Sequence, residues 1–233
     1  MTPAKPSPLL EVAVTIVVPG LVLMQLSGDG ALGSVGALAL ALAFPVGWGV
    51  WDGWRRRKLN WLALVGIAST LLTGGIGLLK LDAQWLAIKE AVVPALMGLV
   101  IAASAWTRHP LIHALVFDAA LLDTERINRA LAARHAAAAF EARLRAGTLL
   151  LAALFIATGV AGYGLARWVV RSPAGTEAFN QELGRLTLLS YPLVALPTML
   201  LMMALLYWLA ASARRLTGLS FGELFHAAPP TPG

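Results

Sequence analysis

The chain has 233 residues, of which 58% are hydrophobic and only 13% are charged. A soluble domain carries about a quarter of its residues as Asp, Glu, Lys or Arg, so this composition excludes an ordinary water-exposed surface and indicates a chain that faces lipid. The net charge of +6 does not indicate nucleic-acid binding, because the charges cluster at the ends of apolar runs, where Lys and Arg fix membrane topology.

Six apolar runs divide the chain, each near the length of about 20 residues that a helix needs to cross the hydrocarbon. They do not alternate as barrel strands would, and a helix satisfies its own backbone hydrogen bonds in lipid. We therefore predict an all-α integral membrane protein, with one six-helix domain over 1–226 and a disordered tail at 227–233. The helices are expected at about 9–27, 31–54, 59–79, 86–107, 146–170 and 185–212.

Charged residues lie before the first predicted helix and at the end of the second. The first is expected to remain as an anchor, because only Lys5 precedes it and no cleavage signature follows. The second ends near Asp52, and Arg55 and Arg56 follow about one helical turn later, close enough for a local ion pair. We interpret Asp52 as the counter-ion of a topology anchor; a substrate site is the alternative.

The fourth predicted helix carries two ionisable residues, Lys89 and Glu90, about one turn inside Trp85. Charged side chains within membrane helices are costly, which makes them candidates for function. Adjacent residues on a helix point about 100° apart, so we expect Glu90 to face the helix bundle while Lys89 extends outward toward the headgroups. The alternative is an interfacial pair that only begins the helix.

The longest polar stretch, 110–145, precedes the fifth helix. Apolar residues recur there near helical spacing, and Arg126, Arg129, Arg134 and Arg143 lie between them. We interpret the stretch as an amphipathic cytoplasmic segment whose basic residues lie near anionic lipid headgroups. A solvated connector between the fourth and fifth helices is the alternative.

Prolines are expected to kink three of the helices, because each removes a backbone donor and frees a carbonyl one turn earlier. In transporters such breaks line solute cavities, whereas single prolines in membrane helices are often only kinks. The polar residues Thr187 and Tyr191 accompany the prolines of the last helix. The predicted kinks are at Pro45, Pro94, Pro192 and Pro197.

The distribution of Lys and Arg predicts the orientation of the chain. Thirteen of the 18 lie in the segments that share a side with the two termini, and five lie on the opposite side. Since cytoplasmic segments carry the excess of Lys and Arg, both termini are expected in the cytoplasm. The second, fourth and sixth helices all contain proline, which suggests three helical hairpin repeats.

Several short motifs together resemble the bacterial intracellular septation protein A family and its uncharacterised six-helix relatives. The resemblance is specific over about 45–115, weaker over 140–219, and only one of hydropathy in the first helix. The long stretch between the fourth and fifth helices departs from the shorter septation proteins. The motifs are Pro45-x5-Trp51-Asp52-x2-Arg55-Arg56-Arg57-x-Leu59, Leu72–Gly75, Ile88-Lys89-Glu90, Thr107-Arg108-His109-Pro110-Leu111, Gly175-Thr176-Glu177-Ala178-Phe179-Asn180 and Leu183-Gly184-Arg185-Leu186-Thr187.

The resemblance implies a bacterial inner-membrane protein tied to envelope integrity or cell division, without a recognised reaction. It offers no catalytic residue to carry over. By the match, the positions of interest are Trp51, Asp52, Arg55, Arg56, Lys89, Glu90, Glu177, Asn180 and Thr187.

Two functions follow as hypotheses. The first is an envelope-associated protein that acts through envelope or division proteins or through membrane lipids, anionic on the cytoplasmic side; association into a homo-oligomer is left open. The second is a small-solute transporter or channel between the proline-containing helices, which requires a polar cavity lined by some of Ser69, Thr70, Glu90, Ser190 and Tyr191. No catalytic constellation, metal-ligand set or cofactor motif is evident, so we do not expect an enzyme.

Overall fold

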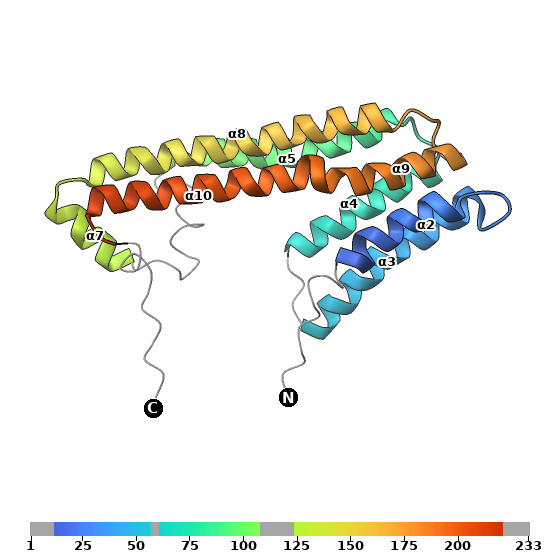
Figure 1. Cartoon of the computed structure of the whole chain (residues 1–233), viewed down its shortest axis with the longest axis horizontal. Coiled ribbons are helices and arrows are strands. Elements are labelled where there is room, and N and C mark those ends of the chain that lie inside the picture. Colours follow the sequence, from blue (N-terminus) through green and yellow to red (C-terminus); the bar gives the residue numbers. More distant parts are fainter. Residues whose placement is uncertain (1–11, 57–60, 108–123, 221–233) are drawn as a thin grey trace. The chain divides into compact units, whose positions relative to one another are not determined.

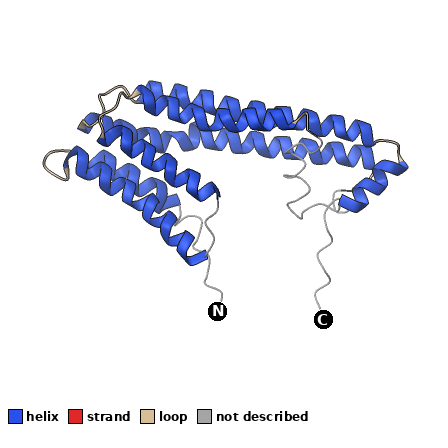
Figure 2. Ribbon diagram, turned by 180° about the vertical axis from the view of Figure 1, so that it is seen from behind, coloured by secondary structure: helices blue, strands red, loops and turns tan. Residues whose placement is uncertain are grey.

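The computed structural model describes residues 12–56, 61–107 and 124–220, and within them the side chains of 52–56, 61–67 and 124–125 are not described. Every regular element in these ranges is a helix (Figure 1, Figure 2), so the all-α prediction is confirmed for this part of the chain. In order along the chain, the elements are η1 Ala13–Val17, α2 Val18–Leu26, α3 Gly33–Arg56, α4 Trp61–Leu78, α5 Gln84–Ser104, α7 Thr124–Ala133, α8 Ala137–Val169, α9 Glu177–Ser190, η3 Tyr191–Ala195 and α10 Leu196–Thr217.

Within the described ranges, four helical stretches are long and apolar enough to cross a membrane: Gly33–Trp51, Gln84–Ser104, Ala137–Val169 and Glu177–Thr217. Two shorter apolar helices, Ala13–Leu26 and Ala68–Leu78, are also present. Large apolar side chains are exposed on these helices, among them Val100, Val160 and Leu201 at 62%, 67% and 58%. Such faces suit lipid rather than water, and the four long helices are compatible with a membrane protein.

Two helices begin earlier than the apolar pattern predicts. The helix expected at 146 begins at Ala137, because alanine-rich sequence favours helix beyond the apolar run. At 33 residues, α8 is about 50 Å long, which exceeds the roughly 30 Å of hydrocarbon. The helix expected at 185 begins at Glu177, after Thr176 caps it by accepting a hydrogen bond from the Phe179 N–H at 3.1 Å.

The structure accommodates the four predicted kink prolines in different ways. Pro45 and Pro94 lie inside α3 and α5, which continue through them as α-helices. Pro192 lies inside the π-helical turn η3, and Pro197 occupies the second position of α10. A wider turn lets a helix continue where a proline has removed a backbone donor, so α9, η3 and α10 form one almost continuous helical segment.

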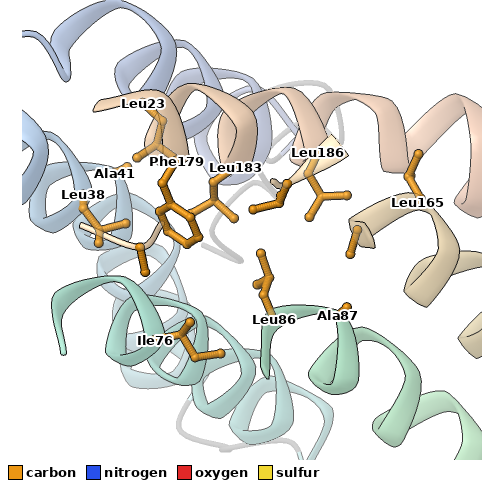
Figure 3. Close-up of a cluster of buried hydrophobic side chains, with 13 residues drawn as sticks. Leu23, Leu38, Ala41, Ile76, Leu86, Ala87, Leu165, Phe179, Leu183 and Leu186 are labelled. Carbon is orange, nitrogen blue, oxygen red and sulfur yellow. The ribbon is translucent and has the colours of Figure 1, made fainter. Parts of the chain in front are cut away.

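The chain divides into two compact units, and the first comprises 1–92 and 160–195. Its core gathers side chains from α2, α3, α4, α9, the start of α5 and the end of α8 (Figure 3). Phe179 lies at the centre of this core and is fully buried. A Cβ added at Gly77 of α4 would lie 2.5 Å from Leu38 Cδ2 of α3 and at the ordinary contact distance of 3.4 Å from the Phe179 ring, so glycine at this position leaves room for the Leu38 side chain against α4.

The second unit comprises 93–159 and 196–233. Within it α8 and α10 run side by side (Figure 1, Figure 2), and Thr158 and Thr198 join them by a hydroxyl–hydroxyl bond of 3.0 Å. The apolar side of α7 also belongs to this core, because Ile127 and Leu131 are buried against residues of α8 and α10. The two large apolar residues of this amphipathic helix are therefore covered by protein.

Candidate functional site

The charged pair predicted in the fourth helix lies in the first unit, on α5. The Lys89 ammonium lies 2.7 Å from Glu90 Oε1, and only 9% of the lysine side chain is exposed. The ammonium also donates to Thr73 Oγ1 at 2.9 Å and approaches Ser69 Oγ at 3.4 Å, both on α4. Three acceptors therefore surround a group that has three N–H donors.

The expected outward direction of the Lys89 side chain was wrong. Lys89 points toward α4, and Glu90 is the more exposed of the two, at 35%. The physical reason is the length of the lysine side chain, which lets its end bend to the carboxylate of the neighbouring residue although the Cβ atoms diverge. An ammonium held away from water needs a paired charge and hydrogen-bond acceptors, and α4 supplies two hydroxyl oxygens.

A cavity of about 150 Å³ lies beside this pair, in the first unit. Its lining residues come from η1 and α2, α3, α4 and α9. Apolar side chains and prolines form most of the wall, and four threonines supply its polar atoms. The lining residues are Thr15, Pro19, Leu23, Leu38, Ala41, Leu42, Pro45, Thr70, Thr73, Leu183 and Thr187.

Thr73 connects the charged pair to the cavity, because it lines the cavity and accepts the Lys89 hydrogen bond. Its own hydroxyl proton is donated to the Ser69 carbonyl at 2.9 Å, and the Thr187 hydroxyl is donated to the Leu183 carbonyl at 3.0 Å. Hydroxyls that donate to the preceding turn retain oxygen lone pairs as acceptors. These two threonines therefore offer the cavity hydrogen-bond acceptors rather than donors.

Asn180, a further predicted position, is fully buried near the start of α9. Its Nδ2 donates to the Ser34 carbonyl of α3 at 2.6 Å, whereas its Oδ1 has no partner among the described atoms. Glu177, one turn earlier, is exposed and accepts a hydrogen bond from Gln181 Nε2 at 3.0 Å. Asn180 therefore joins α9 to α3, and Glu177 contributes to the helix surface.

Some of the other predicted residues line the cavity, some lie at the exposed surface, and the side chains of the rest are outside the described part of the chain. Thr187 and Pro45 line the cavity, whereas Tyr191 is 43% exposed and does not. Neither do the prolines of α5, η3 and α10. The side chains of Asp52, Arg55 and Arg56 lie outside the described residues, although α3 itself continues to Arg56.

Sequence reasoning missed Thr73 and Thr15. The spacing of Ser69 and Thr73, four residues apart, places both on one side of α4, and that signal marks the face that receives Lys89. Thr15 had no comparable signal, since it lies in an apolar run and reaches the cavity only through the packing of η1 on α3 and α9.

No group of three or more metal-ligating side chains occurs among the described residues. No protein-family model, curated protein or solved structure matches the chain.

Proposed function

We propose that the chain is a six-span protein of the bacterial inner membrane, with both termini in the cytoplasm, and that its first unit binds a small polar solute and lets it cross. One observation carries the proposal: the enclosed Lys89 ammonium shares Thr73 with a cavity that four threonines line. An ionisable residue at membrane depth is costly and usually marks a functional path.

The chemistry of the cavity favours an uncharged solute that donates hydrogen bonds. Glu90 balances the charge of Lys89 at 2.7 Å, so the pair adds little net charge. Thr73 and Thr187 present acceptor oxygens, which would replace the water molecules that a solute loses on entry. A volume of about 150 Å³ holds on the order of five water molecules or a solute of that size. Small polyols and amides fit this description.

The test is solute entry into proteoliposomes, followed by light scattering after an osmotic step with glycerol or urea. Vesicles with the wild-type chain should reswell faster than empty vesicles. Ala41→Leu, which fills the cavity from α3, should remove the difference, because Ala41 is a buried lining residue. Equal rates for the wild-type chain and empty vesicles with both probes would refute the proposed path.

A matched pair of threonine variants separates the loss of a cavity acceptor from the loss of a helix contact. Thr187 lines the cavity, and Thr148 does not; each donates to the carbonyl four residues earlier, at 3.0 and 2.9 Å. Thr187→Val should slow probe entry, whereas Thr148→Val should leave it at the wild-type rate. If both variants slowed entry equally, the effect would come from helix stability and not from the cavity.

The resemblance to septation proteins supports a second candidate, an envelope-associated protein that acts through lipids or partners. The observation that favours it is the exposure of Arg126 and Arg129 on α7 and of Arg134 directly after it. Deleting the basic segment is a poor test, because Ile127 and Leu131 belong to the core of the second unit. Replacing the three arginines with glutamine should instead weaken recovery of anionic lipid or envelope proteins from native membranes. Unchanged recovery would contradict this candidate.

A further inference from the structure

The second unit has a groove between α8 and α10, with an apolar lining along one part and a polar lining along the next. Its apolar part, about 440 Å³, is lined by one face of α8 and one face of α10. Leu150 and Leu201 on its walls are 52% and 58% exposed, so the groove lies open at the surface. The lining residues are Leu150, Ala153, Leu154, Ala157, Leu201, Leu205 and Trp208.

A polar hollow of about 410 Å³ continues this groove, and Trp208 belongs to both parts. Arg143 of α8 and Arg215 of α10 line the hollow from its two sides, together with Tyr207 and Ser212. The Arg143 guanidinium lies 5.8 Å from the centre of the Trp208 ring, within cation–π distance. Neither arginine forms an ion pair within the described residues, which leaves two positive charges on one hollow.

The dimensions of the groove match one leaflet of a bilayer. Arg143 and Ala157 are separated by 14 positions on α8, which corresponds to about 21 Å along the helix axis. Half of a bilayer, with its headgroup region, is about 20–22 Å thick. Tryptophan and tyrosine concentrate at the level of the headgroups; Trp208 lies at the junction between the polar and apolar parts, and Tyr207 lines the polar part.

We propose that this groove binds one anionic phospholipid, with its phosphate between Arg143 and Arg215 and an acyl chain along the alanine and leucine face. Charge complementarity selects an anionic headgroup, because two guanidinium groups offer several donors to phosphate oxygens. Basic hollows between membrane helices are suited to such lipids. The proposal specifies a lipid class for the second candidate function. It depends on the second unit alone, so its failure and that of the cavity in the first unit are separate outcomes.

Native mass spectrometry of the purified full chain, with dioleoyl phosphatidylglycerol or dioleoyl phosphatidylcholine added, tests the headgroup site. Phosphatidylglycerol should bind more tightly than phosphatidylcholine. Arg143→Gln and Arg215→Gln should each weaken phosphatidylglycerol binding about fivefold, and the double variant about 25-fold. Arg145→Gln is the matched control, since Arg145 is also exposed on α8 but does not line the hollow; it should change the affinity less than twofold.

Equal affinity for the two lipids, or an equal loss with Arg145→Gln, would overturn the proposal. Ala153→Trp fills the acyl groove and should weaken phosphatidylglycerol binding, whereas Met203→Trp, at an exposed position of α10 outside the groove, should not. If inorganic phosphate displaced the bound phosphatidylglycerol as effectively as excess phosphatidylglycerol does, the hollow would be a phosphate site and not a lipid site. A change of oligomeric mass with unchanged lipid binding would identify a second copy of the chain as the occupant.

Discussion

Removing the carboxylate of Glu90 tests whether Lys89 is a paired charge away from water. Breaking a fully buried ion pair from one side costs about 3–5 kcal/mol. Because Glu90 is 35% exposed and water reaches it, we halve this figure and expect Glu90→Ala to destabilise the protein by about 2 kcal/mol. Lys89→Met should cost about 1 kcal/mol, since it leaves only the more exposed carboxylate unpaired.

The double variant distinguishes the pair from two independent residues. Lys89→Met/Glu90→Ala leaves no unpaired charge, so we expect it to cost about 1 kcal/mol, rather than the roughly 3 kcal/mol that independent effects would give. The assay is reversible unfolding in mixed micelles of detergent and denaturant, with the wild type and three variants measured together. Additive losses within about 0.5 kcal/mol would refute the ion pair.

Three further predictions concern the packing and the helix ends. Gly98→Ala should destabilise the protein by about 1–3 kcal/mol, because its Cβ would lie 2.9 Å from the Ala152 carbonyl oxygen. Gly164→Ala should stabilise the protein by about 0.5–1 kcal/mol, because no heavy atom lies within 4 Å of a Cβ added there. If thermal unfolding showed Gly98→Ala to be more stable than Gly164→Ala, the close approach of α5 and α8 would be contradicted. Thr176→Ala should cost about 1 kcal/mol through loss of the α9 cap, and Thr176→Ser should restore it. Asn180→Ala should lower the free energy of unfolding by about 1–2 kcal/mol, because it removes the hydrogen bond to Ser34. If chemical unfolding gave the same free energy for the variant and the wild type, this contact would contribute nothing to stability.

The sequence singled out Lys89 and Glu90 as the ionisable residues of this helix but gave the wrong direction for the Lys89 side chain. Lys89 and Glu90 stand out because ionisable residues are rare in apolar helices, and this signal needs no knowledge of neighbours. The direction of Lys89 depends on the two hydroxyls of α4, which the sequence of α5 does not contain. The ends of α8 and α9 were missed for a related reason, since the apolar run marks where lipid begins, whereas alanine propensity and the Thr176 cap set where the helix begins.

The two arginines of the groove in the second unit were likewise visible in the sequence, but their proximity was not. The sequence shows that Arg143 and Arg215 are basic residues near the ends of apolar runs, which predicts that they lie near headgroups. That they line one hollow follows only from the antiparallel packing of α8 against α10, because the two arginines are 72 positions apart.

The sequence by itself determined that the chain forms apolar helices suited to lipid, because hydrocarbon cannot bond to the backbone and each long uncharged run must satisfy its own N–H and C=O groups. That property belongs to each segment separately. Only the tertiary structure decided which hydroxyls enclose Lys89 and which arginines share a groove, because helical spacing assigns a residue to a face of its own helix and leaves the opposing helix unspecified.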